Sequence, residues 1–460
     1  MKVVMSPSSL SEKQTTAKVA NTLFTASRPR SRLAHWQKVE NRGQLLIANG
    51  SRLFDIEPGV LAQLDAAARI GDAAVEQMLS DLGVGAPEFI NDTPIQSPPL
   101  HALSLAIAQK CNLGCTYCYA SQGGFGGPAK NMPRETAQRA VEMLVGQAAP
   151  GTRVNLAFLG GEPLANRAVL RSATELAEQL AAARGVVATF SITTNGTLLT
   201  EEDAGFFEQH GFAVTVSLDG VGQAHDRLRP FKHGGGSFEA IMARVQPLLS
   251  IQRQMQVSVR ATITPANLQL RESLDYFLGM GFHGVGFSPL LRSPTGRGEM
   301  ESRDLAELLE SMVECGMEFE HRLARGERYA FTNMVNAMQE LHRGTHRPYP
   351  CGAGAGYLGV SADGDLAACH RFVGDSEGAM GNLTDGINRQ TQNRWLTERH
   401  VHNQSPCTQC WARYLCSGGC HHEVIARGRP ACDYIRGWLH YCLQAYARLH
   451  MLCPDYFPNV

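Results

Sequence analysis

The sequence has no excess of charge of either sign and no long apolar run. Its 460 residues include 42 Lys and Arg against 43 Asp and Glu, a formal net charge of −1. A nucleic-acid groove needs a basic excess, so this balance argues against a nucleic-acid partner.

No apolar stretch approaches the roughly 20 residues of a membrane span, so no membrane segment is expected. The length predicts two or three domains.

Residues 1–34 are nearly free of acids and poor in large apolar residues. They lack the apolar stretch of a secretory signal. Their Ser, Thr and Arg bias is shared with organellar transit peptides, but we predict a disordered tail.

Cysteine is abundant, and most of it lies late in the chain. Of 13 cysteines, ten follow residue 314 and seven lie between residues 407 and 453. Disulfides would be expected in a secreted protein. Without a signal peptide, clustered Cys-x-x-Cys spacings favour metal or iron–sulfur ligation in a reducing compartment. We therefore expect a cytoplasmic protein.

Periodicity predicts a small module over residues 35–95, with three short strands separated by "NRG" and "NGS" turns. Two amphipathic helices follow, "PGVLAQLDAAARI" and "DAAVEQMLSDLG".

From residue 96 to 335, strands alternate with helices in six β-then-α pairs, which predicts a parallel sheet. Six pairs favour a partial or open barrel over the closed barrel of eight. The turns after the strands, where such sheets build their sites, hold the unusual residues: the cysteine triplet, "GGEP", "TTNGT" and "LDG". From residue 336 to 460, Cys, Gly and His become dense, as in a small domain held by metal.

The triplet Cys111, Cys115 and Cys118 is spaced C-x-x-x-C-x-x-C, and no fourth cysteine is close by. A structural zinc site or a ferredoxin cluster would use four protein ligands. Three thiolates leave one iron of a four-iron cluster with a free position that can bind a small molecule.

With the aromatic Tyr117 before its last cysteine, the triplet resembles the hallmark of radical S-adenosylmethionine (SAM) enzymes. The resemblance implies a catalytic [4Fe-4S] cluster whose open iron chelates the amino and carboxylate groups of SAM. One electron then splits SAM to methionine and a 5′-deoxyadenosyl radical, which abstracts hydrogen from an unactivated carbon.

Other loops fit this family, although each could be an ordinary turn. In "GGEP", Gly160 and Gly161 would expose backbone groups and Glu162 would meet the SAM ammonium. Asn195 of "TTNGT" would line the cofactor.

"SLDG" and "HDRLR" resemble the peptide-modifying branch. By that match, Ser217 and Arg229 would hold the methionine carboxylate or the ribose. The ordinary alternatives are a strand-end cap and a surface arginine.

The C-terminal cysteines resemble the seven-cysteine SPASM domain, which holds two auxiliary [4Fe-4S] clusters, so that three clusters are expected in all. Zinc is the alternative, because four-cysteine knuckles share the local spacing. By this match the first cluster would be bound by Cys351, Cys369 and Cys420, and the second by Cys407, Cys410, Cys416 and Cys432. Cys442 is an alternative to Cys432. Cys315 and Cys453 are interpreted as structural thiols.

Two positions depart from the family. Some members supply a fourth cysteine shortly after their equivalent of Cys351, where this chain has small residues and Tyr357, so the first auxiliary cluster could offer an open site to a substrate thiolate. The sulfatase-maturing branch places an Asp after its equivalent of Cys369, where this chain has His370.

The whole pattern implies a partial (β/α)6 TIM-type barrel with an N-terminal winged-helix-like module, similar to peptide-recognition domains, and a C-terminal SPASM domain. It looks most like enzymes that install thioether crosslinks, and within them like the maturases of quinohemoprotein amine dehydrogenase, which join cysteine sulfur to side-chain carbons of Asp or Glu. Carbon–carbon crosslinking, epimerisation or formylglycine-type oxidation are the enzymatic alternatives, and a non-catalytic electron-transfer protein is the alternative of another class. The expected partners are a small Cys-containing peptide or subunit and an electron donor such as flavodoxin or ferredoxin.

Overall fold

The computed structural model describes residues 22–23, 25–85 and 93–457. Their contacts form two compact units, each assembled from separate chain segments. The first unit contains the described residues up to Thr93 together with Met300–Pro350 and residues 398–457, and the second contains Pro94–Glu299 and Cys351–Thr397. The linear domain boundaries expected from the sequence stay a prediction.

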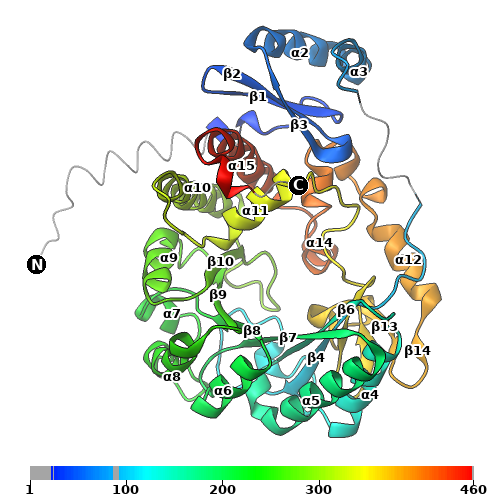
Figure 1. The fold of residues 1–460 in the computed structure, drawn as a ribbon, viewed down its shortest axis with the longest axis vertical. Coiled ribbons are helices and arrows are strands. Elements are labelled where there is room, and N and C mark those ends of the chain that lie inside the picture. The colour runs from blue at the N-terminus through cyan, green and yellow to red at the C-terminus, as the bar shows by residue number, and fades with distance from the viewer. Residues whose placement is uncertain (1–21, 24, 86–92, 458–460) are drawn as a thin grey trace, which may run out of the picture. The chain divides into compact units, whose positions relative to one another are not determined.

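The second unit is built on a sheet whose main part is parallel, as predicted (Figure 1). Its six parallel strands run in the spatial order β10-β9-β8-β7-β6-β4. They are β4 (Ala102–Gln109), β6 (Arg153–Gly160), β7 (Val187–Thr194), β8 (Ala213–Ser217), β9 (Gln256–Ile263) and β10 (Gly284–Pro289). The intervening helices are α4 (Arg134–Gly146), α5 (Arg167–Arg184), α6 (Glu201–Gln209), α7 (Gln223–Asp226), α8 (Phe238–Ile251) and α9 (Leu270–Gly279). The predicted open α/β barrel fold is confirmed.

Each parallel strand alternates large apolar residues with small or polar ones, which gives the sheet two different faces. The apolar face is buried against the helices: Phe190 on β7, for example, makes an edge contact with the ring of His210 at the end of α6. The strand register places the small residues side by side on the other face, called here the inner face. Its members include Ser104, Asn155, Ser191, Thr193, Thr215, Ser217, Ser258, Thr262 and Ser288.

Four short strands that the sequence did not reveal extend this sheet beyond β4. β11 (Tyr357–Val360) pairs in parallel with β4, and β12 (Asp365–Ala367), β13 (Ala379–Asn382) and β14 (Gly386–Ile387) continue in antiparallel order. They come from the cysteine-rich region, where regular periodicity fades. Strands of two to four residues are too short to show a repeat of two, which is why they were missed.

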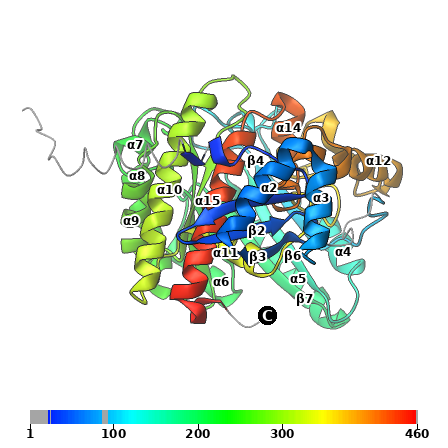
Figure 2. The ribbon, with the colours of Figure 1, turned by 90° about the horizontal axis from the view of Figure 1, so that it is seen from above.

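The N-terminal module of the first unit has the elements that the sequence predicts. Its antiparallel sheet consists of β1 (Ala34–Val39), β2 (Arg42–Ile47) and β3 (Arg52–Ile56), followed by α2 (Pro58–Ile70) and α3 (Asp72–Asp81). The two helices cover this sheet (Figure 2). Trp36, Leu45, Leu64 and Val75 fill the core between them. Whether the module binds a peptide stays a prediction.

Three helices complete the first unit: α10 (Ser302–Ala324), α11 (Thr332–His342) and α15 (Cys432–Leu452). Helices α10 and α15 lie side by side (Figure 2). A side chain at Gly316 would lie 2.4 Å from the ring of Tyr441, and one at Gly437 would lie 2.6 Å from Leu309, so glycine on each helix permits the close approach. None of the described helices is long and apolar enough to cross a membrane.

The module is tied to α15 and to the cysteine-rich region by buried polar contacts within the first unit. His35 Nε2 lies 2.7 Å from His440 Nδ1, and the His35 ring stacks on Trp411 at 4.0 Å. Gln44 donates to the carbonyl of Leu443 at 2.9 Å. The predicted tail, residues 1–34, lies largely outside the described residues, but Ser27 is buried and its carbonyl accepts a hydrogen bond from the Trp411 indole.

We expect this histidine pair to make the first unit acid-sensitive. Burial, and then Arg30, lower the pKa of His440 to about 4. The unfolded chain binds a proton near pH 6.5, so stability is full above that pH and is lost as the pH falls towards 4. Between pH 7.5 and 5 the free energy of unfolding should drop by about 2 kcal/mol from His440 alone. Urea unfolding followed by tryptophan fluorescence measures this, and an undiminished pH slope in His440→Gln would contradict it.

Candidate radical SAM site and cysteine clusters

The cysteine triplet lies in the loop that follows β4, at the carboxyl end of the parallel strands. The backbone N–H groups of Gly114 and Thr116 donate to the carbonyls of Pro230 and Leu228, which fastens this loop to the segment after β8. The thiols of Cys111, Cys115 and Cys118 are close enough to interact electrostatically.

The environment of the triplet fits a positively charged metal cluster. Burial raises the pKa of Cys115 to about 11, with Arg229 acting in the opposite direction and the thiols of Cys118 and Cys111 adding to the rise. Thiolates at such a place need a bound cation to compensate their charge. The three residues therefore suit the [4Fe-4S] cluster that binds SAM in this class of site.

Gly160 and Gly161 allow the loop after β6 to touch the cysteine loop. A Cβ atom at Gly160 would lie 2.4 Å from the carbonyl oxygen of Ala108, and one at Gly161 would lie 2.3 Å from that of Lys110. Gly160 also has a φ of 144°. The glycine pair is thus required for close backbone approach, a reason additional to the exposure of backbone groups expected from the sequence.

Glu162 is fully buried and joins the loops after β6 and β7. Its Oε1 accepts from Leu164 N at 3.1 Å and from the Thr194 hydroxyl at 2.7 Å, and its Oε2 accepts from Asn195 N at 2.8 Å. Burial raises the pKa of this carboxyl. Oε2 retains capacity for a further donor, so Glu162 can still meet an ammonium group as the family match implies.

Asn195 connects the loop after β7 to the cysteine loop. Its Nδ2 lies 3.5 Å from Cys111 Sγ and donates to Asn112 Oδ1 at 3.0 Å, while its Oδ1 accepts from Thr197 N at 2.9 Å. Its side chain thus contacts the cysteine loop directly, and its contact with the cofactor stays a prediction.

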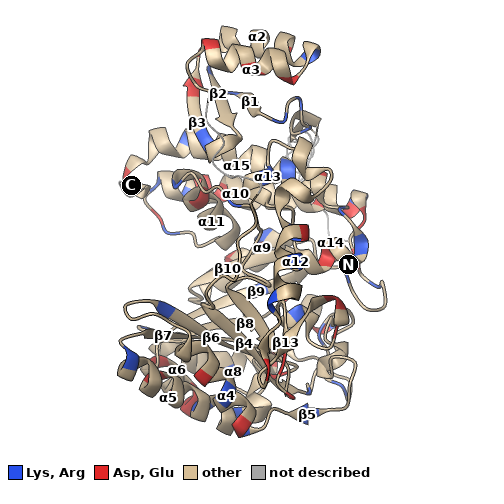
Figure 3. Ribbon diagram, turned by 90° about the vertical axis from the view of Figure 1, so that its right-hand side faces the viewer, with Lys and Arg blue, Asp and Glu red and all other residues tan. Residues whose placement is uncertain are grey.

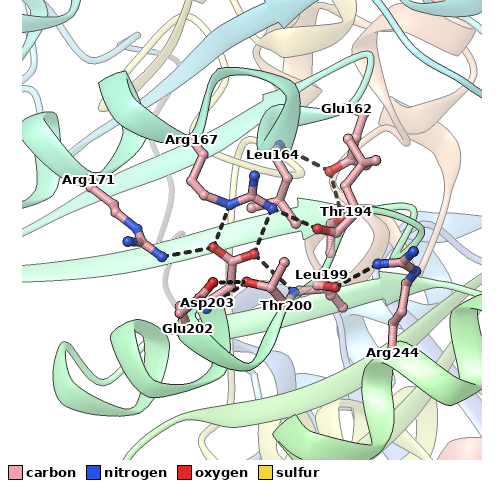
Figure 4. A network of polar contacts seen from close by, with 11 residues as sticks. Glu162, Leu164, Arg167, Arg171, Thr194, Leu199, Thr200, Glu202, Asp203 and Arg244 are labelled. Atoms are coloured by element: carbon pink, nitrogen blue, oxygen red, sulfur yellow. Dashed lines mark hydrogen bonds and ion pairs between the residues drawn. The ribbon is translucent and has the colours of Figure 1, made fainter.

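An ion-pair network holds the loop after β7 in place (Figure 4). Thr200 and Asp203 form a capping box at the start of α6, in which the Asp203 carboxylate accepts from Thr200 N and the Thr200 hydroxyl accepts from Asp203 N. Asp203 also accepts two hydrogen bonds from Arg167, at 2.7 and 2.8 Å. Arg167 also donates to the carbonyl of Leu198, and Arg244 donates to that of Leu199. This network therefore attaches the chain between Asn195 and α6 to α5 through Arg167 and to α8 through Arg244.

A second buried cluster consists of Tyr117, Asp219 and Arg229. The Tyr117 hydroxyl donates to Asp219 Oδ2 and accepts from Arg229 Nη1 at 2.8 Å, while Arg229 Nη1 lies 3.8 Å from the same carboxylate oxygen. Among the described residues, the buried Nε of Arg229 has no hydrogen-bond partner. A guanidinium with a spare N–H fits the carboxylate that Arg229 was predicted to hold. Ser217, the last residue of β8, lies two positions before Asp219.

The "HDRLR" segment is positioned by residues that sequence reasoning did not assign. Asp226 Oδ1 accepts from Ser237 N at 2.7 Å and Phe238 N at 2.8 Å, and His225 Nε2 lies 3.0 Å from the Ser237 hydroxyl. That hydroxyl donates to the carbonyl of Arg229. An acid at a strand end with an arginine ten residues later, as in Asp219 and Arg229, was the available signal for the buried pair.

The Tyr117 hydroxyl gives a testable link between fold and cofactor site. Tyr117→Phe keeps the ring packed on Leu228 and Leu290 but leaves Asp219 and Arg229 each short of one partner. We expect a loss of about 1–3 kcal/mol in unfolding free energy, together with weaker SAM binding. Urea unfolding and calorimetric titration with SAM measure the two effects. Tyr276→Phe, on an exposed ring of α9, is the control, and unchanged values in both variants would contradict the link.

Two of the three residues predicted for the first auxiliary cluster belong to the second unit. Cys369 is buried beside Tyr357, whose hydroxyl donates to the Ser104 hydroxyl at 2.8 Å and lies 2.8 Å from His370 Nδ1. Tyr357 also interacts electrostatically with Cys351. Cys420 belongs to the first unit, so its grouping with these cysteines stays a prediction.

The four cysteines predicted for the second auxiliary cluster come together in the first unit. Burial raises the pKa of Cys416 to about 12, and the thiols of Cys410, Cys407 and Cys432 add to the rise. Cys442 is buried in α15 with its sulfur 3.9 Å from Met334 Sδ. The arrangement favours Cys432 over Cys442 as the fourth ligand. Cys315 is buried in α10, in keeping with a structural thiol.

Known proteins resemble this chain in both sequence and fold. Residues 105–264 match the model of the Radical SAM superfamily. The serine-type anaerobic sulfatase-maturating enzyme of Klebsiella aerogenes is 25% identical over 348 residues, covering 73% of this chain and 83% of the relative. The cysteine-type enzyme of Clostridium novyi is 31% identical over 207 residues, 42% of this chain and 52% of the relative.

Two solved structures resemble the chain in fold. The structure of anSMEcpe with bound AdoMet has a TM-score of 0.63 at 20% identity, covering 78% of this chain and 100% of that one. Streptococcus suis SuiB bound to precursor peptide SuiA has a TM-score of 0.51 at 14% identity, covering 87% and 97%. The solved structures show a shared fold. With the cysteine triplet at the carboxyl ends of an open parallel sheet, the sequence matches show that the chain is a radical SAM enzyme, homologous to the anaerobic sulfatase-maturating enzymes.

Proposed function

We propose that this enzyme is a peptide or protein maturase that installs thioether crosslinks, joining cysteine sulfur to a side-chain carbon in a small subunit or ribosomal peptide. Its homology to enzymes that mature sulfatases, and its likeness in fold to a protein solved with a precursor peptide, support a polypeptide substrate. The SPASM-like cysteine pattern supports two auxiliary clusters besides the catalytic one, fed by a donor such as flavodoxin or ferredoxin.

Within this proposal, each loop at the carboxyl end of the sheet has a task. When bound, the cluster and SAM supply a 5′-deoxyadenosyl radical that removes hydrogen from a substrate carbon. Arg229 holds the methionine carboxylate, and Tyr117 and Asp219 keep its guanidinium in place. Glu162 receives the SAM ammonium at Oε2 and ties two loops around it.

The observation that carries the thioether assignment is the pair Tyr357 and His370. Tyr357 lies shortly after Cys351, in the stretch where some members have a further cysteine, so a free iron could bind the substrate thiolate. His370 follows Cys369, and its Nδ1 is 2.8 Å from the Tyr357 hydroxyl. The Asp that the sulfatase-maturing branch carries there is absent from this sequence, which disfavours simple transfer of that branch's chemistry.

Formylglycine-type oxidation is the second candidate, and the sulfatase-maturating relatives favour it. Mass spectrometry of the peptide substrate after anaerobic co-expression separates the two. A thioether removes two hydrogens, keeps the sulfur and abolishes alkylation of the cysteine. Oxidation leaves an aldehyde that reacts with a hydrazide probe. A product that reacts with the hydrazide, and whose cysteine either still alkylates or has lost its sulfur, would overturn the thioether assignment.

A further inference from the structure

The loops that carry the four cysteines predicted for the second auxiliary cluster are basic. Between residues 404 and 432 the chain has three arginines and a single acidic residue. The arginines lie on or next to the short helices α13 (Arg413–Cys416) and α14 (His421–Arg427), where basic residues are drawn blue in Figure 3. Among the residues that the structure describes, two of these arginines, Arg413 and Arg429, form no ion pair, so no carboxylate neutralises their charge.

Arg429 joins the two ends of the cysteine loop through neutral acceptors. Its Nε donates to the carbonyl of Ser405 at 3.2 Å, its Nη1 to the carbonyl of Gly418, and its Nη2 to Oε1 of Gln404. These acceptors lie just before the first of the four cysteines and just after the third. The guanidinium is therefore held in place by several hydrogen bonds while its full positive charge remains.

Arg413 is buried in the same loop, again on neutral acceptors. Its Nη1 donates to the carbonyls of Cys410, at 3.1 Å, and Arg32, and its Nη2 donates to Oδ1 of Asn49 at 3.4 Å. A buried charge without a partner of opposite sign is strongly destabilising. Within this loop, the groups that can supply the opposite charge are the cysteines, once a metal centre has bound them as thiolates.

The charge of Arg429 reaches two of the four cysteines. Burial raises the pKa of Cys407, and Arg429 acts in the opposite direction. Burial also raises the pKa of Cys432, opposed by Arg436 and then by Arg429. Arg436 is paired with Asp433, so its charge is compensated. The donor set therefore fits a four-iron cluster, whose four thiolates give it a net negative charge that grows when it takes up an electron.

We propose that Arg413 and Arg429 set the reduction potential of the second auxiliary cluster. The inference rests on the proposed function, which assigns that cluster, and adds what makes it reducible. A fixed positive charge stabilises the reduced form more than the oxidised form, because the reduced form is the more negative. The step concerned is the transfer of one electron from the donor, which is oxidised, to the cluster, which is reduced, and no bond forms or breaks.

The test is a redox titration of the cluster-loaded, full-length enzyme followed by electron paramagnetic resonance, with iron and zinc analysis. The signal that is lost in Cys416→Ala identifies the second auxiliary cluster. In Arg429→Gln the ratio of reduced to oxidised cluster at a fixed potential should fall roughly tenfold, which equals about 59 mV for one electron. Arg413→Gln should move the same signal in the same direction, and Arg429→Lys, which keeps the charge, should retain most of the wild-type potential.

The matched control is Arg325→Gln, which removes one positive charge from the exposed end of α10, where Arg325 is paired with Glu327. Solvent and salt screen that charge, so all cluster potentials should equal those of the wild type.

Two outcomes overturn the role of the arginines and leave the cluster assignment standing. One is an unchanged potential in both glutamine variants, and the other is a shift in Arg429→Lys as large as that in Arg429→Gln, since hydrogen bonding rather than charge would then be responsible. If Arg429→Gln fails to assemble the cluster, Arg413→Gln and Arg429→Lys decide. A wild type with stoichiometric zinc and without the signal contradicts the cluster itself, because zinc takes up no electron.

Discussion

Replacing Cys115 with alanine should reduce the cleavage of SAM to 5′-deoxyadenosine to background. Only three protein thiolates are available to the catalytic cluster, and Cys115 is one of them, within reach of the charge of Arg229. Loss of one of three ligands leaves two irons without protein support and prevents stable assembly of the cluster. The measurement is the yield of 5′-deoxyadenosine from the anaerobically reconstituted, dithionite-reduced variant, alongside its iron content.

Cys453→Ala is the matched control, because Cys453 lies after α15 and outside both cysteine patterns. It should keep full iron content and normal cleavage. Normal 5′-deoxyadenosine production by Cys115→Ala would remove the assignment of the triplet.

Replacing Cys369 with alanine should have a different and equally large effect: SAM cleavage continues while crosslinked product disappears. On the proposed function, Cys369 helps to hold the first auxiliary cluster, whose free iron binds the substrate thiolate and accepts the electron left over when sulfur and carbon couple. Ligation would keep the sulfur deprotonated and in place. The catalytic triplet is untouched, so the radical still forms and is quenched without product.

The ratio of 5′-deoxyadenosine to crosslinked peptide measures this uncoupling, and Cys115→Ala, which should stop both, is the reference. Electron paramagnetic resonance of the auxiliary cluster gives an independent signal. It should change on adding a cysteine-containing substrate and stay unchanged with a Cys→Ser substrate. An auxiliary-cluster spectrum insensitive to the substrate cysteine would count against thiolate ligation.

The sequence was sufficient to predict those strands and helices in which a residue pattern repeats over the whole element. The strands β4 and β6–β10 and the module's five elements were predicted because each has an apolar period long enough to recognise. The strands β11–β14 were missed because they contain two to four residues each and owe their conformation to pairing with β4 and with one another.

In the site, too, features that are local in sequence were predicted, and contacts between distant residues were not. The triplet and the loop motifs are local in sequence and were found there. The contacts that position them are not local: Asp219 meets Tyr117 across 102 residues, and Thr194 reaches Glu162 across 32. The close approach that explains Gly161 involves the carbonyl of Lys110 on another loop. No spacing rule identifies such partners, because folding alone brings them together.

Because the first unit is assembled from three separate chain segments, its parts become available for folding at different times during synthesis. The module is made before the rest of the first unit, yet the partners of His35 and Gln44 lie on α15, about 400 residues later. The parallel sheet of the second unit can fold from its own segments before α15, which the module contacts, has been made. On the proposed function, Cys407, Cys410, Cys416 and Cys432 hold the second auxiliary cluster, and they belong to the same segment of the first unit as α15. Insertion of that cluster and the burial of His35 would then both wait until this segment has been made.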